Sequence, residues 1–426
     1  AVQILGEGEW ALRLLPLLAG LASLPLFAVL ARRVLGSGPF ALFAIALFAL
    51  SVPLARYAAE VKQYGLDVLV ALIIVLPATA ILRRSLRPVG IVAVALTGGL
   101  LTLVSFTAAL VTAGVLISVV AISVERRDFV SAVTGVGLAV AGGAAGVAYL
   151  RWAAPPEGLR DRVAGAFRAA EQSPAETASR YLQLTGAEFR WAIVASGVLA
   201  LAGVIALVLR DRPVFWLLTG PFLAAFAADI AGVYPFYQRF SLFTVPIALL
   251  LIAIGARAIW DLDIVARAPA LGLCAVAAAG FVVHAGDTVA HGPQWDSRQD
   301  LRPVLEEVAA ERQDGDVIWI YPAARFAFAY YADRVGLPAG PPAEGIEDPS
   351  RAVLFPEPVT SAPPDVVIGT PFGTAEDLRA DLSALAGPRP RRVWVVFSNV
   401  LPLEDESNPE GALFDHLESI GEWQRS

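Results

Sequence analysis

The segment Arg56–Gly65 brings together side chains suited to binding an anion at a membrane surface. It holds Lys62, the only lysine of the chain, and lies between two apolar runs, 39–55 and 66–82, each about long enough to cross a bilayer. An ammonium group is a compact charge that meets a phosphate well. Cations at the end of a span also commonly extend to the lipid headgroups with no further role. At the level of the residues both interpretations stay open.

If this segment continues the helix of the following span, Tyr57, Glu60 and Tyr64 share one helix face. Arg56 then pairs with Glu60 at i, i+4, and the ammonium of Lys62 is left free to meet an anion. A second cation, Arg239, is predicted on the same side of the membrane.

Arg239 ends the turn Tyr234–Arg239, which also carries Tyr237. Two cations on one face are able to clamp a lipid phosphate or pyrophosphate. Lys62 and Arg239 are therefore the candidate phosphate-binding residues, and the tyrosines Tyr57, Tyr64 and Tyr237 are candidates for shaping the site.

Two carboxylates, Asp67 and Asp229, lie within apolar runs near their predicted outer ends. An unpaired charge at the centre of a span costs up to about 3 kcal/mol. Each carboxylate is therefore expected either to be paired structurally or to take part in function, and both are added to the site candidates.

Composition requires these residues to be positioned by membrane spans. The chain has 426 residues, of which 57% are hydrophobic and only 17% charged, whereas a soluble domain carries about a quarter charged residues. Residues 1–288 have a net charge of +5 and residues 289–426 a net charge of −12. About ten apolar segments of spanning length are predicted in the first part, at 11–31, 39–55, 65–82, 89–104, 106–123, 129–150, 191–209, 213–231, 240–258 and 269–287.

The basic residues orient these spans. Alternate links hold eleven arginines, whereas the short links opposite hold only Arg56, Lys62 and Arg239. The positive-inside rule places the arginine-rich links in the cytoplasm of a multi-pass protein of the cell (inner) membrane. The segment Arg56–Gly65, the long outer loop 151–190 and the domain 289–426 are then extracytoplasmic. The outer loop is amphipathic around Phe167 and Tyr181, and a solvated connector and a substrate platform are both consistent with it.

The part after residue 288 alternates strands and helices. Strands are predicted at 316–321, 365–369 and 392–398, with helices at 298–312, 323–332, 375–386 and 408–420. This order predicts a small α/β domain with a parallel sheet. It has no G-x-G-x-x-G and no P-loop, so no nucleotide site is expected, and a passive or acceptor-orienting role fits better.

Several functional classes are disfavoured. The three histidines, His284, His291 and His416, show no zinc-ligand spacing. No G-x-S-x-G motif points to a serine hydrolase. The basic residues gather at span ends and form no face for nucleic acid. The single cysteine, Cys274, excludes an intrachain disulfide.

Three motifs resemble the GT-C membrane glycosyltransferases, in particular the family 39-like enzymes related to protein mannosyltransferases and lipid A aminoarabinose transferases. The segment Gly6–Pro16 (GEGEWALRLLP) resembles the stretch before their second span. Arg56–Tyr64 (RYAAEVKQY) resembles their tyrosine–glutamate–basic–tyrosine link, and Tyr234–Phe240 (YPFYQRF) their late arginine–aromatic turn. The resemblance covers most of residues 1–288, and the start of the following domain, from Leu301, looks like one found on bacterial members.

The resemblance implies transfer of a sugar from a polyprenyl-phosphate donor to an envelope glycan, lipid or protein acceptor on the outer face. It implies that Lys62 contacts the donor phosphate, that Glu60 shapes the site and that Arg239 assists. The reaction implied is an inverting displacement, with a carboxylate base in the first outer loop, which we expect upstream of Ala1. Some relatives bind a divalent metal, and the residues of this chain neither indicate nor exclude one.

Three other functions are compatible with many spans. A lipid-linked-sugar flippase or transporter would bind the same head group without chemistry, and would show repeats or broken spans in corresponding halves. A polysaccharide polymerase or ligase would place its polar residues on a large outer loop. A membrane anchor for the acidic domain would need far fewer than ten spans.

Overall fold

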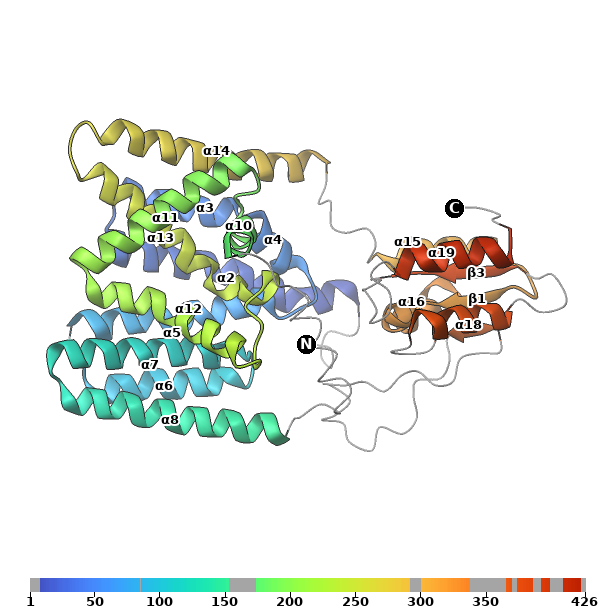
Figure 1. Cartoon of the computed structure of the whole chain (residues 1–426), viewed down its shortest axis with the longest axis horizontal. Helices are drawn as coiled ribbons and strands as arrows, with labels where there is room; N and C mark the ends of the chain where they lie inside the picture. The colour runs from blue at the N-terminus through green and yellow to red at the C-terminus, as the bar shows by residue number, and fades with distance from the viewer. Residues whose placement is uncertain are drawn as a thin grey trace. The chain divides into compact units, whose positions relative to one another are not determined.

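The computed structural model describes residues 8–84, 86–152, 174–291, 300–337, 365–369, 374–385, 392–398 and 409–422. It divides into two compact units, Ala1–Pro293 and Gln294–Ser426. The first is a bundle of helices that lie side by side (Figure 1). The second is a small α/β domain, called the tail domain below.

The helices of the bundle follow the long apolar runs of the sequence, because only a helix satisfies its backbone polar groups inside lipid. Their bounds are α2 (Glu9–Leu35), α3 (Pro39–Leu50), α4 (Val52–Ala59), α5 (Tyr64–Arg84), α6 (Pro88–Thr102), α7 (Thr107–Arg126), α8 (Phe129–Trp152), α10 (Pro174–Thr185), α11 (Arg190–Arg210), α12 (Arg212–Ile230), α13 (Val245–Trp260) and α14 (Arg267–His291). A 3₁₀ segment, η1 (Gln238–Thr244), leads into α13.

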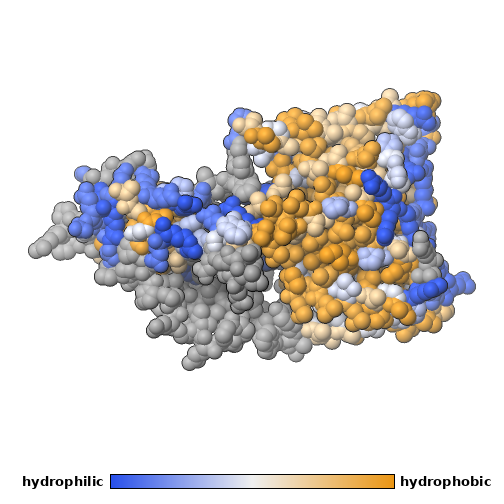
Figure 2. All heavy atoms as spheres, turned by 180° about the vertical axis from the view of Figure 1, so that it is seen from behind, coloured by the Kyte–Doolittle hydropathy of each residue, from blue (hydrophilic) through white to orange (hydrophobic). Residues whose placement is uncertain are grey.

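Among the described residues, eight helices are long and apolar enough to cross a membrane, and the bent pair α3 and α4 makes a ninth if it forms one span. The predicted segment 89–104 corresponds to α6, which has only 15 residues. Outward-facing atoms of the bundle are mostly apolar, with a hydrophilic band at one end (Figure 2). The prediction of a polytopic helical membrane protein is confirmed, with fewer full-length spans than ten.

Close backbone contact holds the centre of the bundle together. Where α11 crosses α13, a Cβ added to Gly255 would lie 1.8 Å from the carbonyl oxygen of Leu199, and one added to Gly203 would lie 2.1 Å from that of Leu251. Glycine is therefore required at both positions, in the manner of small-residue contacts between membrane helices. The helix α13 is the most completely enclosed of the candidate spans.

The arginine-rich links lie at one end of the bundle, which we call the arginine end. Arginine side chains join the helix ends there. Arg83 donates to the carbonyl oxygen of Arg33 at 2.6 Å and forms an ion pair with Asp211 at 2.9 Å. Arg257 donates to the carbonyl oxygen of Leu35 at 2.8 Å. Cations at helix carboxyl ends satisfy carbonyls that have no partner within the helix.

The opposite end of the bundle, called the tyrosine end, carries the turn between α4 and α5, the turn between α6 and α7, the segment 231–239 and helix α10. Of the predicted outer loop 151–190, residues 153–173, including Phe167, lie outside the described residues. The described remainder contains α10, an amphipathic helix that contacts α4, α11, α13 and η1.

The tail domain has a three-stranded parallel sheet with strand order β2–β1–β3, formed by β1 (Val317–Ile320), β2 (Val366–Ile368) and β3 (Val393–Val396). The predicted strands and the parallel sheet are thereby confirmed. Its helices are α15 (Leu301–Glu311), α16 (Arg325–Val335), α18 (Ala375–Leu385) and α19 (Pro409–Ile420), with a short 3₁₀ turn, η3 (Pro322–Ala324). Trp319 is fully buried at the centre of the core.

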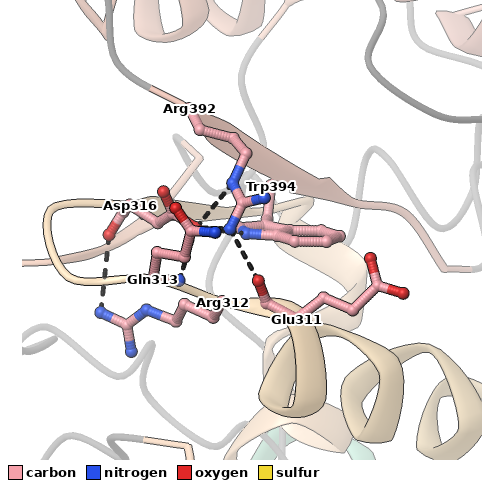
Figure 3. A network of polar contacts seen from close by, with 6 residues as sticks. All are labelled: Glu311, Arg312, Gln313, Asp316, Arg392 and Trp394. Carbon is pink, nitrogen blue, oxygen red and sulfur yellow. Dashed lines mark hydrogen bonds and ion pairs between the residues drawn. The ribbon is translucent and has the colours of Figure 1, made fainter.

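A polar network closes the amino-terminal edge of this sheet (Figure 3). Asp316, 5% exposed, accepts hydrogen bonds from Nε of Arg392 at 2.8 Å, Nε1 of Trp394 at 2.9 Å and the backbone of Gln313 at 3.0 Å. Burial raises the pKa of the Asp316 carboxyl, but these hydrogen bonds outweigh it and hold the pKa at about 2, below the usual 3.8. The carboxylate, in the residue before β1, therefore joins that strand to Arg392, the residue before β3, and to Trp394 within β3.

Because the folded-state pKa of Asp316 is lowered, its contribution to the stability of the tail domain is present above pH 4 and is lost as the pH falls from about 4 towards 2. An Asp316→Asn substitution leaves the Arg392 charge without its carboxylate, and we expect it to destabilise the domain by about 2 kcal/mol at pH 7. Hydrogen exchange of β1 and β3 in the full chain measures this loss.

The exposed Asp333 of α16 provides the control, because Asp333→Asn is expected to leave the exchange rates of β1 and β3 unchanged. Equal protection in the Asp316→Asn variant and the original chain at pH 7 would contradict the structural role of the network.

Candidate functional site

The link between α4 and α5 is a turn, and the prediction that it continues the helix of α5 is wrong. Helix α4 ends at Ala59, Glu60 has extended backbone angles (φ −87°, ψ 140°), and α5 begins at Tyr64. The backbone N–H of Lys62 donates to the carbonyl oxygen of Glu60 at 2.7 Å, which closes the turn tightly. Tyr57, Glu60 and Tyr64 therefore do not share one continuous helix face.

The turn also changes the predicted charge pairing. Nζ of Lys62 lies 2.6 Å from Oε1 of Glu60, so the ammonium is paired and the prediction that it is free is wrong. The guanidinium of Arg56, predicted to pair with Glu60, lies 5.7 Å from the centre of the Tyr57 ring instead. The side chain of Lys62 remains 37% exposed, so its other two protons are accessible to a ligand.

Aromatic rings connect the link to the segment 234–240, although the two are far apart in sequence. Ring centres are 5.3 Å apart for Tyr57 and Tyr64, and 5.9 Å apart for Tyr64 and Phe240. Tyr234 contacts both Phe240, at 6.0 Å, and Phe106, at 5.6 Å. We call these five rings the aromatic cluster.

The predicted second cation lies on this cluster. The guanidinium carbon of Arg239 is 5.8 Å from the ring centre of Tyr64 and 5.6 Å from that of Phe240. Arg239 and Glu60 both lie within electrostatic range of Tyr57. The structure thus brings Tyr57, Tyr64, Glu60, Lys62 and Arg239 to one place at the tyrosine end.

Asp67 lies beneath this group, in the first turn of α5, and is 3% exposed. Its Oδ1 accepts a hydrogen bond from the hydroxyl of Ser105 at 2.5 Å, and Ser105 is 2.7 Å from the hydroxyl of Thr107. Both hydroxyls belong to the turn that opens α7. Among the described residues no cation pairs with Asp67, so the carboxyl group is held by hydroxyls and joins α5 to α7.

Asp229 has a structural partner as well. Its Oδ1 accepts a hydrogen bond from the backbone N–H of Phe236 at 2.9 Å. This bond fixes the segment that leads to Arg239. Asp229 therefore acts on the site through the backbone that positions the arginine.

Tyr237 points to a residue that the sequence interpretation did not include. Its hydroxyl accepts a hydrogen bond from Nη1 of Arg180 at 2.7 Å, and Arg180 also pairs with Glu176 on α10 at 2.9 Å. The next residue, Tyr181, bonds Thr244 at 2.7 Å. An arginine beside a tyrosine on the amphipathic segment was the only sequence signal for this attachment of α10.

Burial governs the titration of the phenols outside the spans. It raises the pKa of Tyr181, and it raises that of Tyr234, where the nearby Asp67 and Tyr64 act in the same direction. Both hydroxyls therefore remain neutral hydrogen-bond donors at physiological pH. The hydroxyl of Tyr234 donates to the carbonyl oxygen of Phe240 at 3.0 Å and so holds η1 against the turn.

Some of the enzymes that the chain resembles bind a divalent metal. In the described parts of the chain, no group of three His, Cys, Asp or Glu side chains is close enough to hold a metal ion. Asp67 and Asp229 already accept hydrogen bonds from Ser105 and Phe236.

Hydrogen bonding to Ser105 predicts an energetic coupling between α5 and the start of α7. In a double-mutant cycle of Asp67→Ala and Ser105→Ala we expect a coupling free energy of about 1–2 kcal/mol, because either single change removes the hydrogen bond between these two buried groups. Unfolding of the purified chain in detergent measures it.

Thr102→Ala is the matched control, since the Thr102 hydroxyl donates within its own helix to the carbonyl oxygen of Gly98. It should show no coupling with Asp67→Ala. Additive effects of the Asp67 and Ser105 changes would contradict the proposed link.

Comparison with known proteins adds no family to this description: no protein-family model matches the chain, and no curated protein was found that is similar to it.

Proposed function

We propose that this chain is a membrane glycosyltransferase that moves a sugar from a polyprenyl-phosphate donor to an envelope glycan, lipid or protein on the extracytoplasmic face. The observation that carries the proposal is that Arg239 lies on the aromatic cluster, while Glu60, which pairs with Lys62, lies within electrostatic range of Tyr57 in the same cluster. The two cations come from segments far apart in sequence, and they lie at the end of the bundle whose short links hold few basic residues. A lipid phosphate is the anion normally found at a membrane surface.

The two cations offer complementary contacts to a phosphate. Lys62 supplies a compact charge with two accessible protons. The guanidinium carbon of Arg239 lies 5.8 Å from the ring centre of Tyr64 and 5.6 Å from that of Phe240, and its planar group is able to form two parallel hydrogen bonds to phosphate oxygens. Holding the guanidinium before the substrate arrives lowers the entropy cost of binding.

The same contacts assist the chemical step. A hydroxyl of the acceptor attacks the anomeric carbon, the bond from that carbon to the phosphate oxygen breaks, and its electron pair stays on the phosphate. Lys62 and Arg239 stabilise the charge that grows there, which is where preorganised donors contribute most to catalysis. The proton of the acceptor hydroxyl goes to a carboxylate base, as expected for an inverting displacement.

A lipid-linked donor fits the surroundings of the cluster. The exposed side chains of the candidate spans are mostly apolar (Figure 2), so a polyprenyl chain can lie against the bundle while its phosphate stays at the tyrosine end. The arginine distribution supports an extracytoplasmic position for that end. Nucleotide sugars, which are cytoplasmic, are therefore less suitable donors.

A lipid-linked-sugar flippase is the second candidate, and one observation favours it. The pair α3 and α4 is bent by 47° at Ser51, and broken helices are typical of transporter binding sites. The hydroxyl oxygen of Ser51 is buried and has no hydrogen-bond partner among the described residues. Movement of lipid without release of phosphate distinguishes the flippase from the transferase.

The test adds radiolabelled polyprenyl-phosphate sugars to native membranes that contain the full-length protein together with its envelope acceptors, and measures the polyprenyl phosphate released. Lys62→Gln is expected to lower the rate of transfer by about 100-fold or more, because it removes a charge that stabilises the leaving group. Lys62→Arg is expected to retain part of the activity.

Arg87→Gln, a change of the same kind at the exposed arginine-end residue Arg87, should leave transfer unchanged. Equal activity of the Lys62→Gln variant and the original protein would remove Lys62 from the site. Lipid movement in the absence of phosphate release, with every donor tried, would favour the flippase.

A further inference from the structure

One oxygen of Glu60 is buried and unpaired within the proposed site. Oε1 of Glu60 meets the ammonium of Lys62 at 2.6 Å. The other oxygen, Oε2, is buried and accepts no hydrogen bond from any described residue. Leaving a buried charged acceptor without a donor is unfavourable, and such atoms in folded proteins commonly have a functional reason.

The surroundings limit what can pair with this oxygen. A carboxylate oxygen can only accept hydrogen bonds, so its ligand must present a hydroxyl or an N–H. The cations close by, Lys62 and Arg239, favour an anion at the same place. A ligand that satisfies all three groups therefore carries a negative charge and a hydrogen-bond donor a few ångströms apart, as the phosphate and the hydroxyls of a glycosyl phosphate do.

We propose, on the basis of the function proposed above, that Glu60 makes the site distinguish the sugar-bearing phosphodiester from the bare polyprenyl phosphate that the reaction leaves behind. Its Oε2 accepts a hydrogen bond from a sugar hydroxyl of the donor. Its negative charge, held beside Lys62, opposes the additional charge of the product.

The charge difference follows from the bonds that change. The donor is a phosphodiester with a single negative charge. When the bond between the anomeric carbon and oxygen breaks, the electron pair stays on the phosphate and gives a monoester, whose second ionisation has a pKa of about 6, so that it carries between one and two negative charges at pH 7. The sugar hydroxyl that paired with Oε2 departs in the same step.

Both effects weaken the hold on the product. Glu60 has then lost its hydrogen-bond donor, and the phosphate beside it carries more negative charge than that of the sugar-bearing lipid. The Glu60 carboxylate also competes with this phosphate for the ammonium of Lys62. The ion pair between Glu60 and Lys62 is the arrangement expected once the lipid phosphate has left. Glu60 is in this account a residue that sets specificity and promotes product release.

The experiment measures binding of two lipids of equal chain length to the full-length protein in nanodiscs, without acceptor. One is polyprenyl phosphate, and the other is polyprenyl-phosphate sugar, tested with mannose, glucose and arabinose. Glu60→Gln keeps the size of the side chain and removes its charge. We expect it to bind polyprenyl phosphate about tenfold more tightly and the sugar-bearing lipid no more tightly than the original protein does.

Two further variants separate charge from folding. Glu60→Asp retains the charge and is expected to keep the weak product binding. Glu125→Gln changes the charge in the same way at the arginine end, where Glu125 pairs with Arg212, and is expected to alter the affinity for neither lipid. Thermal unfolding midpoints within about 2 °C of the original protein show that the variants are folded.

The possible outcomes distinguish the inference about Glu60 from the proposed function. Unchanged affinities of the Glu60→Gln variant for both lipids, while Lys62→Gln still weakens donor binding, would overturn the inference about Glu60 and leave the proposed function standing. Binding of none of the lipids to the original protein would remove both. An equal gain in affinity for both lipids would also overturn the inference, because it would show general charge repulsion without discrimination.

Discussion

Lipid offers no hydrogen bonds, so the bundle must satisfy the ends of its helices and its buried polar groups with its own side chains. At the arginine end, guanidinium groups do this for helix carboxyl termini, as Arg83 does for Arg33 and Arg257 for Leu35. At the tyrosine end, hydroxyls and carboxylates perform the corresponding task, with Ser105 on Asp67 and the backbone of Phe236 on Asp229. Different kinds of side chain thus perform this task at the two ends of the bundle.

This division bears on the role of the two cations Lys62 and Arg239 at the tyrosine end. Lys62 is exposed beside Glu60, and Arg239 lies on aromatic rings, so neither is used to close a helix. Asp67 and Asp229 hold the segments that carry them: the first turn of α5 next to Lys62, and the turn before Arg239. The buried carboxylates thus support the geometry, and the proposed chemistry belongs to the residues nearer the membrane surface.

Much of the fold follows from the sequence because long apolar runs and strand–helix alternation are local signals. The predicted strand at 392–398 agrees with β3, and the helices match their apolar runs. The turn at Glu60 was not predicted, because the sequence pattern of the short helix α4 followed by a tight turn is equally compatible with one continuous helix. The partners of Asp67 and Tyr237, namely Ser105 and Arg180, are separated from them by 38 and 57 residues, and no local pattern reports such contacts.

Sidedness tests the account most directly, since a donor-binding site and its cations must face the extracytoplasmic space. In a background with Cys274 replaced by Ala, single cysteines are introduced by Val61→Cys, at a residue that is 48% exposed, and by Arg87→Cys at the arginine end. Intact cells are treated with a membrane-impermeant maleimide. The account predicts that the Val61→Cys variant is labelled at once and the Arg87→Cys variant only after permeabilisation, and the reverse pattern would contradict it.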